Sequence, residues 1–365
     1  MRSFFLLLLT IAFNHSEIYS QVTKSEMESL MRIPLQYTVL KTTEKIQVDG
    51  KDEEKAWDKA PWTEVFTDIV SGNSTSSNKT RCKMLWDDEF LYLYAQLEEP
   101  GIWASIKDHD ASVFQDNAFE IFIDPIGDTH NYFEFQINAY STVWDLFMPK
   151  PYRNGGRSLS SWDIKGLKKA IYLDGTLNQP GDKDRSWNIE LAVPFNSLKM
   201  SRKGTPDEGT IWRMNFSHVQ WDVDVKDGKY VRKRDTIGKL FPEHYSVWSP
   251  QGIINLHYPE RWGYVLFSDT LPVSAFLSVE TENLKLLLWK YYYLQQEFKR
   301  EYGKYANTIK KLNKKYRRII DPVSQSARIE MEATDHLFRV QCFLPALNTN
   351  MSINQDGEVY QEKVP

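Results

Sequence analysis

Apolar and polar side chains alternate along residues 116–147, in three runs separated by short turns. Successive side chains of a β-strand point to opposite faces, so this alternation predicts strands at residues 119–124, 133–138 and 142–147. One face of the predicted sheet is apolar, and the other carries Glu120, Gln136 and Asn138. Such a polar face either binds a ligand rich in hydroxyl groups or is the solvated side of an ordinary antiparallel sheet.

The same alternation continues on both sides of this region. It predicts strands at residues 46–48, 82–86, 90–97, 187–193, 211–219 and 264–267, and one helical turn at 51–57. In the strand at 211–219, Trp212 belongs to the apolar set, whereas Arg213 and Asn215 belong to the polar set. Residues 37–269 are therefore predicted to form one mainly β domain.

After Thr270 the pattern changes to a helical one. Apolar residues recur at three- and four-residue steps over residues 282–320, which predicts one long helix with a possible bend at Gly303. Four short strands are predicted at 328–333, 336–344, 350–354 and 358–361. Residues 270–365 are thus expected to be an extension in which the helix packs on a small antiparallel sheet. Domain swapping, or docking of a protein partner through the helix, is the alternative.

The N-terminus has the pattern of a secretory signal peptide. A basic start at residues 1–3 precedes an apolar run at 4–13 that is too short to span a bilayer, and residues 1–20 are predicted to be removed. No cysteine follows the predicted cleavage position, which argues against a lipid anchor. Residues 21–36 are expected to be a linker, and the mature protein is expected to be secreted or periplasmic, without a transmembrane segment.

Composition narrows the range of partners. A formal net charge of −4 gives no electrostatic basis for binding nucleic acid. Aromatic residues make up 14% of the 365 residues, with 12 Trp and 19 Tyr, which suits β-structure or contact with carbohydrate. Cys82 and Cys342 either pair in an oxidising compartment or remain two buried thiols.

Six ordered segments resemble the family 9 carbohydrate-binding modules. They are DGKDEEKAW (49–57), MLWDDEFLYLYAQLEEP (84–100), DNAFEIFIDP (116–125), WNIELAVPF (187–195), WRMNFSHVQWD (212–222) and WSPQGIINLHYPERWGYVLF (248–267). The resemblance covers about residues 37–268 and implies an antiparallel β-sandwich that binds oligo- or polysaccharide between aromatic rings and carries structural calcium. His218 stands where family members often have Arg.

On this basis the sequence predicts a non-catalytic carbohydrate-binding protein that supports polysaccharide catabolism. A pair of rings is expected to clamp the sugar, and neighbouring polar groups are expected to bond its hydroxyls. The candidate rings are Trp103, Trp144, Trp248 and Trp262, and the candidate polar residues are Glu120, Gln136, Asn138, Arg213 and Asn215. The alternative for Trp248 and Trp262 is a packing role in the interior.

Two oxygen-rich loops are the candidate calcium ligands. Asp108 and Asp110 lie in the first loop, and Asp124 and Asp128 lie in the second. Both segments also read as plain turns.

Two other functions use different residues. A glycoside hydrolase or its accessory subunit would need two carboxylates, for which Asp116, Glu120, Glu134 and Glu190 are candidates. A haem-binding sandwich would use Met148, His130 or His218 as axial ligands, although the chain has no CxxCH attachment motif.

Overall fold

One large curled sheet forms the body of the protein in the computed structural model, which describes residues 23–74, 78–199, 204–271, 277–316, 328–345 and 348–363. Its strands follow the order β7 (Val143–Met148), β6 (Tyr132–Asn138), β5 (Ala118–Asp124), β10 (Ile211–Gln220), β14 (Gly263–Ser268), β1 (Gln36–Lys41), β3 (Thr80–Trp86), β4 (Phe90–Glu98), β9 (Ser186–Pro194) and β8 (Lys168–Asp174). Strand β13 (His244–Val247) pairs with β10, and β2 (Thr67–Asp68) pairs with β13. Neighbouring strands are antiparallel, except that β1 runs parallel to β14 and β3.

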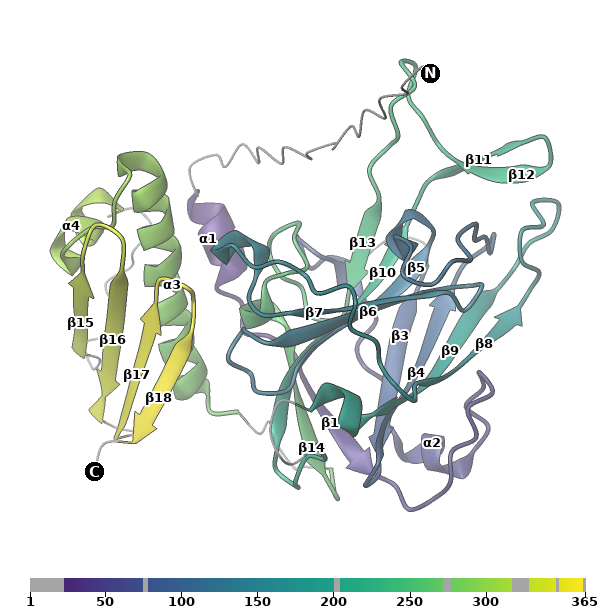
Figure 1. The fold of residues 1–365 in the computed structure, drawn as a ribbon, viewed down its shortest axis with the longest axis horizontal. Helices are drawn as coiled ribbons and strands as arrows, with labels where there is room; N and C mark the ends of the chain where they lie inside the picture. The colour runs from purple at the N-terminus through teal and green to yellow at the C-terminus, as the bar shows by residue number, and fades with distance from the viewer. Residues whose placement is uncertain are drawn as a thin grey trace, which may run out of the picture.

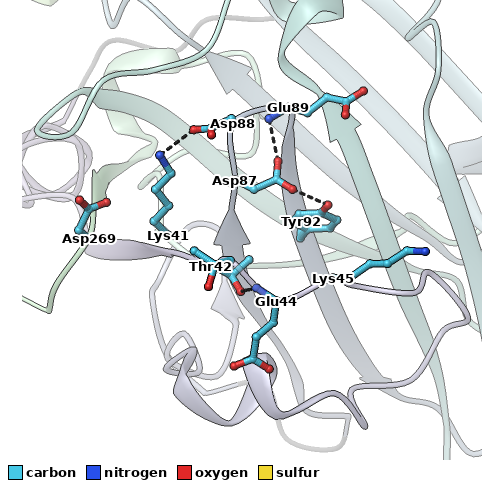
Figure 2. Close-up of a pocket in the computed structure, with 10 residues that line it drawn as sticks. Lys41, Thr42, Glu44, Lys45, Asp87, Asp88, Glu89, Tyr92 and Asp269 are labelled. Atoms are coloured by element: carbon cyan, nitrogen blue, oxygen red, sulfur yellow. Dashed lines mark hydrogen bonds and ion pairs between the residues drawn. The ribbon is translucent and has the colours of Figure 1, made fainter.

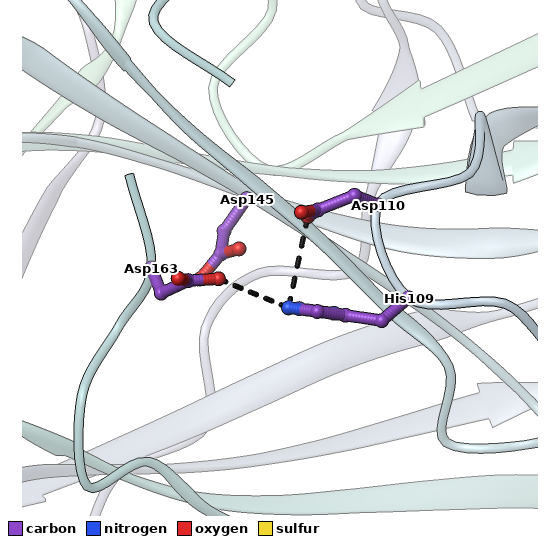
Figure 3. A group of neighbouring side chains, drawn as sticks. All are labelled: His109, Asp110, Asp145 and Asp163. Atoms are coloured by element: carbon purple, nitrogen blue, oxygen red, sulfur yellow. Dashed lines mark hydrogen bonds and ion pairs between the residues drawn. The ribbon is translucent and has the colours of Figure 1, made fainter. Parts of the chain in front are cut away.

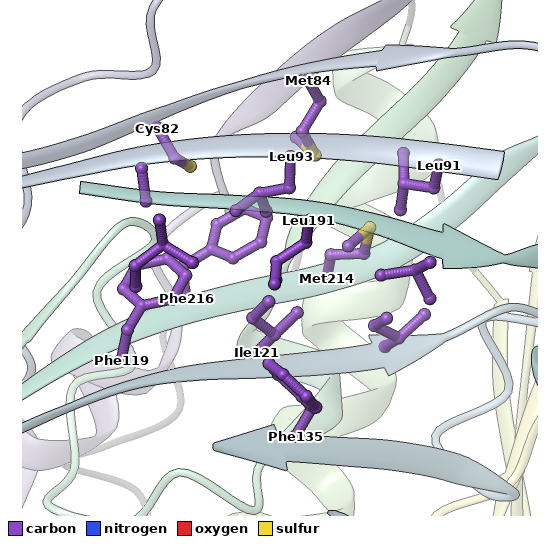
Figure 4. Packing of buried hydrophobic residues seen from close by; sticks show 14 of the residues in the cluster. Cys82, Met84, Leu91, Leu93, Phe119, Ile121, Phe135, Leu191, Met214 and Phe216 are labelled. Atoms are coloured by element: carbon purple, nitrogen blue, oxygen red, sulfur yellow. The ribbon is translucent and has the colours of Figure 1, made fainter. Parts of the chain in front are cut away.

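The two halves of this sheet face each other around the main hydrophobic core. Phe119, Ile121 and Phe135 come from one half, and Met84 and Leu93 come from the other (Figure 4). All of them belong to the apolar sets of their strands, because alternate residues point into the space between the halves. The predicted β-sandwich and the predicted inward-facing set are both confirmed.

Two smaller pieces complete this domain. Helix α2 (Lys55–Lys59) places Trp57 against the outer side of β3, β4 and β9, where the ring is fully buried. Strands β11 (Val223–Lys226) and β12 (Lys229–Arg232) form a separate hairpin that projects beyond the end of β10 (Figure 1).

Part of the predicted linker at residues 21–36 is a helix. Helix α1 (Lys24–Leu30) begins with a capping box, in which Thr23 and Glu26 each accept a hydrogen bond from the other's backbone N–H. Met27 and Leu30 are buried against the C-terminal extension. The segment is therefore helical because of its cap and its two buried apolar residues. The prediction of a linker did not take these features into account.

The C-terminal extension consists of helices laid on a small antiparallel sheet, as predicted. The sheet has the order β15 (Arg328–Ala333), β16 (Phe338–Leu344), β17 (Thr349–Asn354) and β18 (Val359–Lys363). The predicted single helix is instead α3 (Val279–Tyr302) and α4 (Ile309–Lys315), because Gly303 adopts φ +70° and ends α3 with a left-handed cap. Helix α3 lies between the small sheet and the sandwich (Figure 1). Its apolar residues cover the protein's own sheet, and docking of a partner through it stays a prediction.

Three other predictions concern the ends and the thiols. The predicted signal peptide lies outside the described residues and stays a prediction. No described helix is long and apolar enough to cross a membrane. Cys82 and Cys342 are both free and buried, one in each hydrophobic core, so the alternative of two buried thiols is correct and the pairing is not formed.

Candidate functional site

The polar set of β10 lies beneath other parts of the chain. Arg213 donates hydrogen bonds to the carbonyl oxygens of Glu260 and Trp262, and its guanidinium stacks 3.8 Å from the ring centroid of Tyr264. Asn215 donates to the carbonyl of Ser249 at 2.9 Å and accepts from its N–H. The segment 248–262 therefore covers this face, and neither side chain is free to bond a sugar. This placement corrects the predicted ligand contacts.

The predicted polar residues of β5 and β6 form a buried amide–carboxyl cluster. Gln136 Nε2 lies 2.8 Å from Glu120 Oε1 and 2.7 Å from Glu134 Oε1, and all three residues are buried. Burial raises the pKa of Glu134 to about 7. Burial, and then the charge of Glu134, raise the pKa of Glu120 well above its usual value. These side chains are packed in the interior and do not offer a sugar-binding surface, which corrects that prediction.

We expect the stability of the protein to fall as the pH rises from about 4.5 to about 7, the ordinary and the folded-state pKa of Glu134. Over this range the folded protein keeps a proton on Glu134 that the unfolded chain has released. The free energy of unfolding therefore falls by about 3 kcal/mol across the range. Urea unfolding at several pH values should show a weaker decrease in Glu134→Gln than in the wild type. Glu332→Gln, at an exposed position of β15, is the matched control. Equal pH dependence in Glu134→Gln and the wild type would contradict this assignment.

The predicted aromatic clamp does not assemble at the surface. Trp248 and Trp262 are both 0% exposed and pack in two separate clusters of buried residues. Trp144 is half-buried, with its ring centroid 6.0 Å from that of Phe114. The prediction that Trp248 and Trp262 hold a sugar is corrected, and the packing alternative describes them. The contact of Trp144 with a sugar stays a prediction.

Asn138 organises the loop between β4 and β5. Its amide donates to the carbonyl of Ile106 at 2.9 Å and to Asp116 Oδ2 at 3.0 Å. Asp116, fully buried, in turn accepts hydrogen bonds from the backbone N–H groups of Ser105 and Ile106. Both residues therefore hold the loop that follows Trp103, and neither faces a ligand.

An aromatic-lined cleft of about 900 Å³ lies at the end of β10, between the loop after β4, the strand β13 and the β11–β12 hairpin. Four aromatic side chains line it, namely Trp103, Trp221, Tyr230 and Tyr245. Polar side chains of Glu99, Asn117, Asp222, Glu243 and His244 line it as well. Of the nine predicted sugar-binding residues, Trp103 lies in this cleft. Among the described residues, this cleft thus brings several aromatic rings and several hydrogen-bonding side chains together.

Trp221 is held in the cleft by its neighbours. Its backbone N–H donates to Asn117 Oδ1 and its indole N–H donates to the carbonyl of Phe114, both at 2.8 Å. The guanidinium of Arg232 lies 4.8 Å from the ring centroid. Asn117 also donates to Glu99 Oε1, which fixes the amide. The ring is therefore oriented before any ligand arrives, which lowers the entropic cost of binding.

The hairpin reaches the loop after β4 through Tyr230. A Cβ added at Gly101 would lie 2.6 Å from the Tyr230 hydroxyl, so the end of this side chain packs directly on the backbone at position 101. The hairpin and the loop therefore meet, and both line the cleft. Sequence reasoning missed Tyr230 and Tyr245, which lie on short strands. It also missed Trp221, which is the first residue after β10 and therefore lies at the end of the strand, next to the loops that line the cleft.

A second hollow, of about 680 Å³, lies beside the β3–β4 turn (Figure 2). Lys41 pairs with Asp88 at 2.6 Å, and Asp87 accepts hydrogen bonds from Glu89 N–H and the Tyr92 hydroxyl. Most of the residues that line it are charged. It offers one ring, so it is less suited than the cleft to stack a sugar.

The loop of Asp124 and Asp128 does not fit calcium. Asp124 is fully buried, and its two carboxylate oxygens accept hydrogen bonds from the backbone N–H groups of Ile126, Gly127 and Thr129. Asp128 caps the same loop by accepting from His130 N–H at 2.9 Å. The two carboxylates hold a turn, which was the alternative interpretation of these residues.

The residues proposed for the two other functions do not form those sites either. Glu120 and Glu134 lie together, but they are buried and both bonded to Gln136. The Glu190 carboxylate accepts hydrogen bonds from the Trp57 indole and from the backbone of Asp49 and Gly50. His218 is fully buried, is hydrogen-bonded to Thr80 and pairs with the start of β5. His130 follows the end of β5, so the two histidines lie at opposite ends of that strand. Met148 packs with Trp262. Neither a catalytic carboxylate pair nor a haem pocket is built from these residues in the described part of the chain.

Parts of two xylanases are similar in sequence to this chain. Endo-1,4-beta-xylanase C of Paenibacillus barcinonensis is 33% identical over 99 residues, which are 27% of this chain and 8% of that enzyme. Endo-1,4-beta-xylanase A of Thermoanaerobacterium saccharolyticum is 25% identical over 190 residues, 52% of this chain and 13% of that enzyme. The match therefore spans a small part of both enzymes.

A solved structure, a family 9 carbohydrate-binding module from Caldicellulosiruptor kristjanssonii in complex with glucose, is 14% identical, with a TM-score of 0.40. The similarity covers 66% of this chain and all of that module. The model of the carbohydrate family 9 binding domain-like family matches residues 48–236, just over half of the 365 residues. This protein therefore belongs to the carbohydrate family 9 binding domain-like family.

Proposed function

We propose that the protein is a non-catalytic carbohydrate-binding protein and that the sugar occupies the cleft lined by Trp103, Trp221, Tyr230 and Tyr245. The observation that carries this proposal is the gathering of these rings in one cleft of a family 9 domain. The C–H groups of a pyranose ring pack on an aromatic face, which is an apolar contact with a defined geometry. A cleft with several rings therefore suits a chain of sugar units.

Hydrogen-bonding groups beside the rings support the same proposal. Oγ of Ser246 and Nε1 of Trp103 are buried and have no hydrogen-bond partner among the described residues. Both residues line the cleft. Buried polar groups are normally paired, so a sugar hydroxyl would recover the missing interaction if the cleft opens slightly on binding and exposes these atoms.

Binding without catalysis is supported by the hydrogen bonds of Glu99, the most buried carboxylate that lines the cleft. Glu99, 3% exposed, accepts hydrogen bonds from Asn117 on one oxygen and from the Trp187 indole on the other, the latter at 2.7 Å. A general acid or a nucleophile needs an oxygen that can reach the glycosidic bond. Glu99 is thus committed to holding Asn117 in place.

Trp221→Ala is expected to weaken carbohydrate binding by at least tenfold and to leave the melting temperature nearly unchanged. Loss of one stacking face removes roughly 1.5–3 kcal/mol of apolar contact with the sugar, and 1.4 kcal/mol corresponds to a tenfold change. A glycan array first identifies the sugar, with xylo-oligosaccharides included because both related enzymes are xylanases. Calorimetry of wild type and variant then measures the affinity.

Trp62→Ala is the matched control for this experiment. Trp62 is also half-buried and also faces an arginine, with Arg81 4.0 Å from its ring centroid, but it lies on α2's side of the sandwich. We expect it to bind sugar as the wild type does. Unchanged affinity in both Trp221→Ala and Tyr245→Ala would place the sugar elsewhere. Turnover of a glycoside by the wild type would overturn the non-catalytic assignment.

A further inference from the structure

Four side chains with metal-ligating atoms converge at one end of β7, outside the cleft. His109, Asp110, Asp145 and Asp163 each place one such atom within 4.8 Å of the others (Figure 3). His109 Nε2 lies 3.0 Å from an oxygen of Asp163 and 3.7 Å from an oxygen of Asp110. The residues come from three separate segments of the chain, so the fold brings them together.

Asp145 shows that this group lacks a partner. Its side chain is 2% exposed and points toward the other three residues (Figure 3). One carboxylate oxygen accepts the N–H of Ile164 at 2.7 Å, and the other is buried with no hydrogen-bond partner among the described residues. An unpaired buried carboxylate oxygen is costly, and a cation in the group would remove that cost.

The orientation of His109 fits a metal ligand. Its Nδ1 lies 3.0 Å from the carbonyl oxygen of Val143, which can only accept, so Nδ1 carries the hydrogen. Nε2 therefore faces the carboxylates of the group, and its lone pair becomes available to a cation that displaces the proton from it. Metal-ligating histidines commonly have their second nitrogen held by a carbonyl in this way.

The two lysines beside the group do not pair with its carboxylates. Two lysines, Lys107 and Lys169, line a hollow together with His109, Asp145 and Asp163. Lys107 Nζ lies over the ring of Tyr140, 4.6 Å from its centroid. Lys169 donates to the carbonyl and the hydroxyl of Ser141. Three carboxylates therefore stand together with no lysine bonded to them among the described residues.

We propose that His109, Asp110, Asp145 and Asp163 bind one divalent transition metal ion, with zinc as the representative. An imidazole nitrogen together with carboxylate oxygens suits zinc, whereas calcium takes oxygen ligands alone. The site differs from the calcium prediction, with which it shares Asp110. The ion would tie the 108–111 loop and the segment around Asp163 to β7, so it would act as a structural clamp.

The test uses the full chain after treatment with a chelator. Calorimetry should show one zinc ion bound per chain, and zinc should raise the melting temperature by several degrees. His109→Ala and Asp145→Asn should each weaken zinc binding at least tenfold and abolish the thermal shift. Because His109 is 58% exposed, its variant is expected to fold even if the Asp145 variant does not.

His244→Ala is the control, since His244 faces one carboxylate, Asp222, at 3.5 Å. It should bind zinc as tightly as the wild type. Three results would overturn the proposal: no stoichiometric zinc binding, binding of calcium in preference to zinc, or equal loss in His244→Ala and His109→Ala.

Discussion

Trp248→Ala is expected to destabilise the protein by about 3–5 kcal/mol, as is usual when a large buried aromatic side chain is removed. The ring is 0% exposed and packs edge-on to Tyr37, with centroids 6.4 Å apart, and against Phe216 at 5.8 Å. A Cβ added at Gly263 would lie 2.3 Å from this ring, so the indole packs directly on the backbone of β14. The truncation leaves a cavity that the neighbouring rings and the strand backbone cannot fill.

Equilibrium unfolding in urea, followed by circular dichroism, measures this loss. Trp144→Ala is a control of the same chemistry at a half-buried position, and we expect a clearly smaller effect there. Sugar binding by Trp248→Ala should persist under conditions in which the variant is still folded. A variant that keeps wild-type stability but no longer binds sugar would restore Trp248 to the clamp predicted from the sequence.

Alternation along the strands predicted the core because period two is a local property. Phe119, Ile121 and Phe135 face inward as expected (Figure 4). The same period does not reveal whether the opposite face meets water or another layer of chain. Arg213 and Asn215 are on the expected face, yet they are covered by a segment distant in sequence, and Glu120 is buried as well. Polar residues under such a layer are paired within the protein, so they resemble a binding face in the sequence alone.

The cleft and the metal-ligating group were predictable only in part, for a related reason. Trp103 and Asp110 stood out as single residues in loops. Trp221 belongs to the cleft because the β11–β12 hairpin and the loop after β4 meet there. No local sequence pattern predicts the contact between the hairpin and the loop. Asp145 and Asp163 reach His109 through the position of β7 at the edge of the sheet. Sites built from several segments require the tertiary structure before their members can be grouped.

Glu260→Gln is expected to destabilise the protein by about 3–5 kcal/mol, because it leaves a buried charge without its partner. Glu260 accepts from Arg153 at 2.8 Å, and the two side chains are 1% and 10% exposed. The Tyr293 hydroxyl of α3 donates to the other oxygen of Glu260, and the guanidinium lies 4.3 Å from the ring centroid of Tyr258. The pair thus joins the sandwich to the C-terminal extension.

A double-mutant cycle separates the charge effect from general damage at this joint. Arg153→Met removes the charge and keeps an apolar stem, so the double variant should be more stable than Glu260→Gln alone. The exposed pair of Lys59 and Glu44, also 2.8 Å apart, is the control, and Glu44→Gln should change the unfolding free energy by less than about 0.5 kcal/mol. If Glu260→Gln behaved like Glu44→Gln, water would have to reach the joint, and α3 would be a loosely attached extension. A large and coupled loss instead makes α3 part of the same cooperative unit as the sandwich, because Tyr293 and Arg153 depend on one carboxylate.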